Sequence, residues 1–340
     1  MKPLNSAETL SEKILTSAVY SLASDIHFYP FSEKTNIFFR INGIRVFQTS
    51  ISTTKYQLLL TYYKFTAGMD IGETRRPQNG TITYQTNSKR YALRLSTLPI
   101  NQMESMTIRI LPQEDNYALE DLFLFPQQLE RIKSWMTHRS GMILFTGPTG
   151  SGKTTTLYAL LESLMKNNAY QTITLEDPIE KDINNILQVQ VNEQAGITYQ
   201  TGLKAALRHD PDIIMIGEIR DAYTAQFVLE ASMTGHLVLS TLHAKNALGT
   251  IYRLLDMGIK RTDLQQFLIA VAALDLLTIQ AANTNKRRAA ILELLDGTTL
   301  EHILKQDKLP ASKYFHTFNH LRKKAYAYGF ISEETFHAKA

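Results

Sequence analysis

The residues from Gly147 to Thr154 have the types and spacing of a phosphate-binding loop. They match G-x-x-x-x-G-K-[ST] at every fixed position. Glycines let consecutive backbone N–H groups turn toward phosphate oxygens, where side chains would obstruct them. Lys153 is expected to reach the β- and γ-phosphates of ATP, and the Thr154 hydroxyl to bind Mg²⁺. The predicted nucleotide-binding residues are Gly147, Pro148, Thr149, Gly150, Ser151, Gly152, Lys153, Thr154 and Thr155.

A strand and a helix are expected on either side of this loop. The apolar run 142–146 (MILFT) lies between two glycines, which is typical of a short buried parallel strand. Apolar residues recur at helical spacing over 155–165, so a helix is predicted directly after the loop. The positive end of that helix would then face the triphosphate and favour its binding.

Two carboxylates follow predicted strands further along the chain. The run 171–175 ends at a proline-containing turn, beyond which lies Glu180; the run 213–216 is followed by Gly217 and then Glu218. Parallel sheets bind ligands at the carboxyl ends of their strands. ATP hydrolysis needs one carboxylate for the metal and its water and another to orient the attacking water. Glu218 and Glu180 are the candidates, with Glu218 also assigned to the metal. An exposed loop acid is the alternative interpretation of Glu180.

Two histidines flank a fourth apolar run, 237–242. His236 and His243 are seven residues apart, so their side chains point to opposite faces of an unbroken strand. They therefore resemble two separate sensors rather than a metal pair, and a packing role is the alternative for each. The chain has no cysteine, and no third ligand stands nearby at metal spacing. A zinc site is not expected.

In combination, these motifs resemble those of the secretion ATPase superfamily, the motors of type II secretion, type IV pili and competence pseudopili. The similar segments in the second half are GPTGSGKTTTLYALL (Walker A), TLEDPIE (Asp box), DPDIIMIGEIRD (Walker B) and TGHLVLSTLHA (His box). The N-terminal signatures are SDIHFYP, FRINGIR, RRPQNGTI, RLSTLP and TIRIL. The resemblance covers about residues 20 to 295.

The resemblance implies an α/β fold: a RecA-like P-loop ATPase domain with a parallel sheet, preceded by a smaller α+β, PAS-like domain, in a hexameric ring. It implies ATP and Mg²⁺ as cofactors. It also implies that His236 and His243 sense the γ-phosphate region, and that arginines of the N-terminal domain reach the nucleotide. A forked, permanently charged guanidinium suits the spread charge of a phosphate. The matching arginines are Arg94 and Arg109, together with Arg75 or Arg76.

The departures from the superfamily bear on which machine the chain serves, not on its activity. The four-cysteine zinc module of many members is absent, and 281–285 runs instead into KRRAAILELL. Leu274-Asp275-Leu276 replaces the usual Gln-Arg-Leu, and Asn42 replaces an aspartate. The missing module, and a start near the second N-terminal domain of the family, resemble the competence DNA-uptake ATPases of Gram-positive bacteria.

Composition and patterning predict two domains. The chain has 340 residues, of which 44% are hydrophobic and 20% charged, enough for an N-terminal α+β domain over 1–111, a linker over 112–127 and an ATPase domain over 128–340. An amphipathic helix is predicted over 10–22, antiparallel hairpins near 81–95, and a buried helix over 267–277.

The expected setting is the cytoplasmic face of a membrane. The start of the chain has no signal-peptide pattern. The net charge is only +4 and the positive residues are scattered, so direct nucleic-acid binding is not expected. The partners implied by the resemblance are further copies in a homo-hexamer and a polytopic inner-membrane platform protein.

The leading hypothesis is a hexameric ATPase that drives assembly of a competence pseudopilus, a type IV pilus or a type II secretion apparatus. A pilus retraction motor is the alternative within the class. A RecA-like nucleic-acid translocase and a nucleotide-gated scaffold that scarcely hydrolyses ATP are the alternatives outside it.

Overall fold

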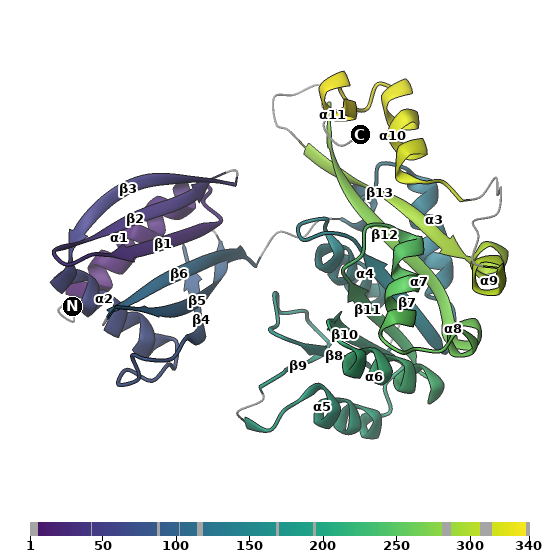
Figure 1. Ribbon diagram of the computed structural model, residues 1–340, viewed down its shortest axis with the longest axis horizontal. Coiled ribbons are helices and arrows are strands. Elements are labelled where there is room, and N and C mark those ends of the chain that lie inside the picture. The colour runs from purple at the N-terminus through teal and green to yellow at the C-terminus, as the bar shows by residue number, and fades with distance from the viewer. Residues whose placement is uncertain are drawn as a thin grey trace. The chain divides into compact units, whose positions relative to one another are not determined.

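The chain forms two compact units, Met1–Asp115 and Asn116–Ala340 (Figure 1). The computed structural model describes residues 6–41, 43–86, 89–101, 103–113, 118–167, 170–192, 195–280, 287–306 and 315–337. The departures at Asn42 and 281–285 lie outside these residues. Each unit has its own hydrophobic core, so the two are described separately.

The N-terminal unit is a six-stranded antiparallel sheet with two helices. Its strands run in the order β3-β2-β1-β6-β5-β4. The strands are β1 (Asp25–Pro30), β2 (Lys34–Ile41), β3 (Ile44–Ser52), β4 (Gln78–Gln85), β5 (Arg90–Ile100) and β6 (Met103–Pro112), and the helices are α1 (Ser6–Tyr20) and α2 (Thr53–Thr66). The hairpin predicted near 81–95 is β4–β5.

Alternating burial in these strands fixes which face of the sheet forms the core. Ile26 and Phe28 of β1 are buried, and they pack in one cluster with Ile14 of α1 and Leu59 of α2. The predicted amphipathic helix is therefore present and packs on its own unit. Its C-terminal limit was wrong: Leu22 lies beyond the helix, at φ +54°, and is exposed.

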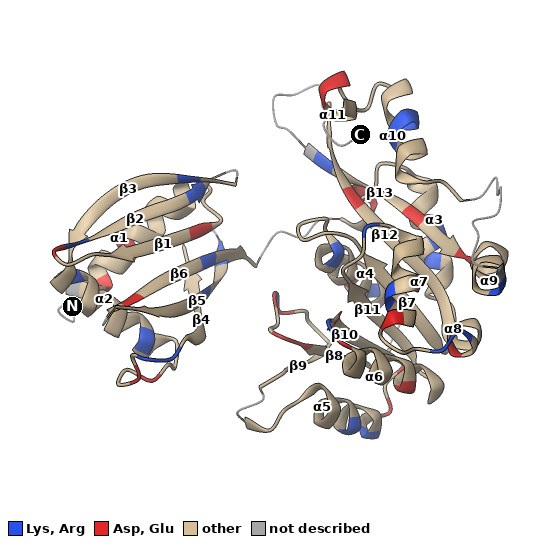
Figure 2. Cartoon of the chain, in the orientation of Figure 1, with Lys and Arg blue, Asp and Glu red and all other residues tan. Residues whose placement is uncertain are grey.

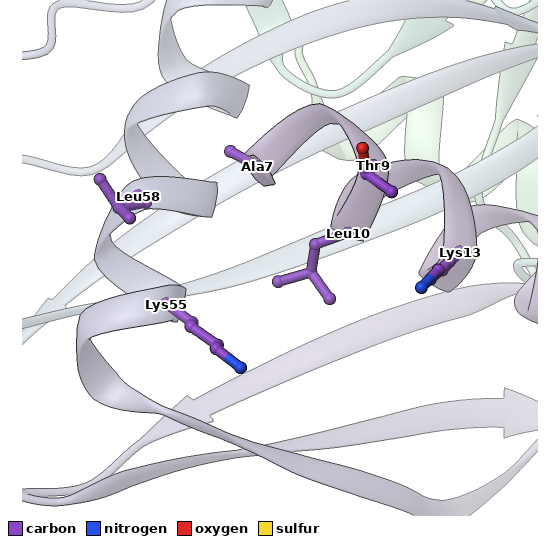
Figure 3. A pocket seen from close by; sticks show the side chains of 6 residues that line it. All are labelled: Ala7, Thr9, Leu10, Lys13, Lys55 and Leu58. Carbon is purple, nitrogen blue, oxygen red and sulfur yellow. The ribbon is translucent and has the colours of Figure 1, made fainter. Parts of the chain in front are cut away.

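A groove of about 260 Å³ lies between α1 and α2 (Figure 3). Its lining shares no residue with the predicted nucleotide site. The lining residues are Ala7, Thr9, Leu10, Lys13, Lys55 and Leu58.

The second unit is an α/β fold built on a seven-stranded sheet in the order β13-β12-β7-β11-β10-β8-β9. All neighbouring strands are parallel except β12 and β13. The strands are β7 (Gly141–Thr146), β8 (Thr172–Glu176), β9 (Leu187–Gln190), β10 (Ile213–Ile219), β11 (Leu237–Leu242), β12 (Leu268–Ile279) and β13 (Arg287–Asp296).

Helices cover both faces of this sheet (Figure 1). Ile143 and Phe145 of β7 pack in a cluster with residues of α3 (Pro126–Trp135) and α4 (Lys153–Asn167). Met142 and Leu144 point to the other cluster, which the strands form together with buried residues of five helices. Those helices are α5 (Tyr199–Ala206), α6 (Ala222–Met233), α7 (Ala247–Asp256), α8 (Arg261–Phe267) and α9 (Gly297–Gln306). This two-sided burial is why the strands read as continuous apolar runs.

One predicted element was wrong: the segment 267–277, expected as a buried helix, is mostly strand β12. It pairs with β7 on one side and β13 on the other. A strand buried on both faces gives the same unbroken apolar pattern as a buried helix, so periodicity does not separate them. Two C-terminal helices, α10 (Phe318–Ala327) and α11 (Glu333–His337), pack near the β12–β13 hairpin.

Within the described parts of the chain, no helix combines the length and apolar character needed to cross a membrane.

Candidate functional site

The predicted nucleotide residues gather at the carboxyl edge of the second sheet. Strands β7, β11, β10 and β8 are neighbours and run parallel, so the segments that follow them meet at one edge. The phosphate loop follows β7, His243 follows β11, Glu218 lies at the end of β10, and the Asp177–Pro178 turn follows β8.

The backbone of the phosphate loop fits the geometry that phosphate binding requires. Gly147 has φ +148°, and a Cβ there would lie 2.5 Å from Ser151 Oγ and 2.6 Å from Leu274 O. Gly150 has φ +80° with nothing within 4 Å of a Cβ, so its backbone faces open space. Ser151 Oγ is buried without a hydrogen-bond partner among the described residues. The loop thus offers open backbone and an unsatisfied hydroxyl, as an anion cradle would.

Lys153 is held inside this loop. Its Nζ donates to Gly147 O at 2.9 Å and to Pro148 O at 3.2 Å, and the residue is 8% exposed. Burial lowers the pKa of Lys153, while the negative charges of Glu218 and Glu180 oppose that effect. The ammonium is therefore positioned to exchange backbone carbonyls for phosphate oxygens.

A bulge in β10 sets the orientation of Glu218. Ile216 pairs with Ser240 and Ile219 with Leu242, so β10 has one more residue than β11 over this stretch. Bulges of this kind re-aim a side chain. The hydroxyls of Ser240 and Thr241 donate to the carbonyls of Ile216 and Gly217 at 2.7 and 2.8 Å. The bulge explains why the acid follows a glycine instead of closing the strand directly.

His243 connects Glu218 to Lys153. Its Nε2 lies 3.0 Å from Glu218 Oε1, and its Nδ1 lies 3.4 Å from Lys153 Nζ and 3.2 Å from Gly147 O. A neutral ring that donates from Nε2 to Glu218 leaves Nδ1 to accept from Lys153; a protonated ring would donate to Gly147 O instead. The chain Lys153–His243–Glu218 is the central feature of the site.

Arg220 bridges the two acidic segments, and sequence reasoning did not single it out. Its guanidinium donates to Glu218 Oε2 and to Asp177 Oδ2, each at 3.2 Å. Partial burial opposes its charge, but the hydrogen bond and charge of Glu218 outweigh burial and raise the pKa of Arg220. Its place two residues after Glu218, within GEIRD, was the available signal.

Of the two acids around the Asp177–Pro178 turn, the structure exposes Glu180 and buries Glu176. Glu180 acts electrostatically on Lys153, and its backbone N–H donates to the Tyr158 hydroxyl at 3.1 Å. Glu176 accepts hydrogen bonds from Tyr158, Thr174 and Gln188. No local sequence pattern predicts this buried cluster, because it joins a helix to a strand end and to a loop.

His236 does not reach the phosphate loop of its own unit, contrary to the expectation that both histidines attend the γ-phosphate. It lies at the amino end of β11, where its carbonyl accepts from Gly141 N at 3.1 Å. β7 extends six residues from there to the loop, a length of roughly 20 Å at about 3.3 Å per residue. His236 Nδ1 contacts Thr234 Oγ1 at 2.9 Å instead.

Two of the predicted arginines, Arg94 and Arg109, form part of a charged row in the N-terminal unit. Register pairs align side chains from five adjacent strands on one face of the sheet. Asp25 is at the centre of the row: burial opposes its ionisation, but hydrogen bonds from Arg109 and Ser24 outweigh burial and lower the pKa of Asp25. The row consists of Arg45, Arg40, Asp25, Arg109 and Arg94.

Arg75 and Arg76 lie outside this row. Both are exposed, before β4, and Arg76 is 3.9 Å from Glu73. Elsewhere, basic and acidic residues are interspersed over both units (Figure 2).

The loop, the acid at the end of β10 and the parallel sheet define a P-loop nucleotide-binding protein. The chain belongs to the family described as type II/IV secretion system protein, whose model matches residues 2–317. It is 40% identical to the competence protein ComGA of Bacillus subtilis over 347 aligned residues, which cover 98% of each chain. It is also 40% identical over 306 residues to type II secretion system protein E of Dickeya dadantii, covering 86% of this chain and 60% of that protein. These matches confirm the resemblance predicted from the motifs.

Two solved structures of ATPases are similar to the chain over nearly its full length. The pilus retraction motor PilT with bound ADP has a TM-score of 0.77 and 27% identity, with 96% of each chain covered. The ATPase DotB of Legionella pneumophila has a TM-score of 0.76 at 21% identity, covering 100% of this chain and 97% of the other. The second likeness bears on the fold alone.

Proposed function

We propose that this protein is a Mg²⁺-dependent ATPase that works as a homo-hexameric ring and drives assembly of a competence pseudopilus. The observation that carries the ATPase proposal is the contact chain Lys153–His243–Glu218 beside an open glycine loop. The similarity over nearly the full length to a competence protein, and the similarity to type II secretion proteins E, support the choice of machine.

The residues of the site divide the work of hydrolysis. The loop glycines and Lys153 bind the phosphates, and Glu180 and Glu218 orient and deprotonate the attacking water. Thr154 and Glu218 supply the oxygen ligands that Mg²⁺ prefers. When bound, Mg²⁺ neutralises charge on the phosphates. Loss of the γ-phosphate removes a negative charge from beside Lys153. Because His243 contacts both Lys153 and Glu218, we expect this change in charge to alter the hydrogen bonding of Glu218.

The N-terminal unit completes the site through its arginines. Arg94 and Arg109 lie in the charged row, and the side chain of Arg109 is 63% exposed, so its guanidinium can approach a phosphate. We propose that the six-stranded sheet with two helices serves as a PAS-like domain whose arginines act on nucleotide bound in the ring. His236 has no role at the nucleotide of its own unit. In a ring, the amino edge of the sheet that bears it is free to meet a neighbouring subunit.

The proposed function implies a membrane partner and a location in the cell. A pseudopilus motor acts from the cytoplasm on a polytopic platform protein at the inner face of the membrane. The relatives named as type II secretion system proteins support this setting.

The test is the ATPase rate as a function of protein concentration, with light scattering and with or without single-stranded DNA. We expect the specific rate to rise as hexamers form, to be indifferent to DNA, and to disappear in Lys153→Ala, which removes the phosphate-binding ammonium. Monomeric activity stimulated by DNA would replace this proposal by the translocase, and ATP binding without turnover would replace it by the scaffold.

The direction of force separates assembly from retraction. Cells that lack an assembly motor should form no pseudopili and take up no DNA, whereas cells that lack a retraction motor should accumulate surface filaments. Filament counts by electron microscopy in a deletion strain, complemented by wild type or Lys153→Ala, decide between the two.

A further inference from the structure

A buried hydrogen-bond network joins the helix of the phosphate loop to the segment that carries Glu180. At its centre is Tyr158, on α4 five residues after Lys153. The Tyr158 hydroxyl donates to Glu176 Oε2 and accepts from the backbone N–H of Glu180, with the oxygen and nitrogen 3.1 Å apart. One hydroxyl therefore bonds to the residues on both sides of the Asp177–Pro178 turn.

Glu176 is itself fixed in place. The residue is 3% exposed, and its Oε1 accepts from the Thr174 hydroxyl at 2.6 Å and from the Gln188 amide at 3.2 Å. Burial and the charge of Glu176 raise the pKa of Tyr158, so the phenol keeps its proton. Because that proton is directed to Glu176, a lone pair of the same oxygen remains for the N–H of Glu180.

A second contact joins the same face of α4 to the same segment. Glu162 lies four residues after Tyr158 and thus on the same helix face. Its Oε1 is 2.7 Å from Lys181 Nζ. Gln188 supports this segment from the other side, since its amide nitrogen donates to Lys181 O at 3.0 Å. The segment 180–181 is therefore attached to α4 at two points, through the backbone N–H of Glu180 and the side chain of Lys181.

We infer that Tyr158 is a positioning residue for ATP hydrolysis: it fixes the Glu180 segment to α4, so that the phosphate loop and the Glu180 carboxylate are held as one body. This inference rests on the proposed ATPase function and on the part of Glu180 in it. α4 begins at Lys153, so a nucleotide that orders the loop also sets the start of this helix. A shift of α4 then reaches the Glu180 backbone through the Tyr158 hydroxyl, with the Glu162–Lys181 ion pair holding the next residue.

The test is Tyr158→Phe, which keeps the ring in the core and removes both hydrogen bonds. We expect kcat to fall about 10- to 100-fold, as for a small displacement of a catalytic group. The Kd for ATP and the number of nucleotide sites per chain should not change, because the phosphate loop is intact. Tyr170→Phe, which alters a tyrosine packed on the same core cluster, is the matched control and should leave kcat unchanged.

A double-mutant cycle separates positioning from a merely structural role. Glu180→Gln should lower kcat, and adding Tyr158→Phe to it should lower kcat no further, because Tyr158 acts through Glu180. Losses that multiply, or an unchanged kcat in Tyr158→Phe while Glu180→Gln is inactive, would overturn this inference and leave the ATPase proposal standing. A wild-type chain without ATPase activity would overturn both.

Glu176→Gln provides a second route if Tyr158→Phe does not fold. It keeps the volume of the side chain but places an amide donor against either Tyr158 or the donors Thr174 and Gln188, so the tyrosine loses its fixed orientation. The same loss of kcat and the same lack of additivity with Glu180→Gln are expected. Full activity in this variant would contradict the inference.

Discussion

The two edges of the parallel sheet are built from the same strands but differ in chemistry. At the carboxyl edge, the ends of three strands bring together the Lys153 ammonium, the His243 imidazole and the Glu218 carboxylate. The imidazole lies 3.4 Å from the ammonium and 3.0 Å from the carboxylate. At the amino edge, His236 contacts Thr234 and the start of β7. Two histidines at the ends of one strand therefore occupy different environments.

The difference shows that strand direction, more than residue type, decides which side chains can act on a nucleotide. Each of the parallel strands places its following segment at the carboxyl edge, and the open glycine loop lies there as well. At the amino edge lie the segments that lead from each helix into the next parallel strand. A polar residue there is about one strand length away from the phosphates.

The largest effect is expected at the carboxyl edge from Glu218→Gln. The amide keeps the shape of the side chain but neither holds Mg²⁺ as a carboxylate does nor accepts a proton, so kcat should fall by about 10²- to 10⁴-fold. ATP should still bind and remain trapped unhydrolysed, which a filter-binding or fluorescent-nucleotide assay would show. Glu230→Gln, an exposed acid on α6, is the control; equal losses in both variants would contradict the assignment.

A smaller effect should separate the two histidines. His243→Ala removes hydrogen bonds to charged groups and should lower kcat by about tenfold or somewhat more. His236→Ala should leave the rate of dilute, unassembled protein unchanged. The decisive measurement is kcat for both variants below and above the concentration at which rings form. A loss in His236→Ala confined to the ring would mean that the amino edge meets the nucleotide of a neighbouring subunit.

The smallest effect is expected on stability, from the buried acid Glu293, which hydrogen-bonds the segment that follows His243. Glu293 accepts from Ala247 N, at the start of α7 after the His243 loop, at 3.1 Å and from Phe318 N at 2.8 Å. Burial raises its pKa above the usual 4.5 despite these bonds. The folded state therefore binds this proton more tightly, and stability is lost as the pH rises from 4.5 through the folded pKa.

Urea unfolding of wild type and Glu293→Gln at pH 5 and pH 8 measures this contribution. The variant lacks the titrating group. Its free energy of unfolding relative to wild type should therefore be higher at pH 8 than at pH 5, by on the order of 1 kcal/mol. Glu301→Gln, an exposed acid on α9, should show no such change. Parallel pH dependence in wild type and Glu293→Gln would contradict the prediction.

Much of this site could be predicted because its residues follow local patterns. The phosphate loop depends on glycines at fixed spacing, and the acids follow apolar runs that end at a glycine or a proline. Arg220 and Tyr158 were missed because their partners, Asp177 and Glu176, are 43 and 18 residues away. The strand β12 was mistaken for a helix because burial on both faces hides the period of two.

The sequence by itself determined the nucleotide loop, the strand and helix on either side of it, and the family. These properties depend on spacing within a few residues, where backbone geometry limits the alternatives. Only the tertiary structure decided that His243 contacts Glu218 while His236 lies at the opposite edge, that β10 bulges to aim its acid, and that one tyrosine joins α4 to the Glu180 segment. Those contacts depend on which elements pack together, and packing is a property of the whole core.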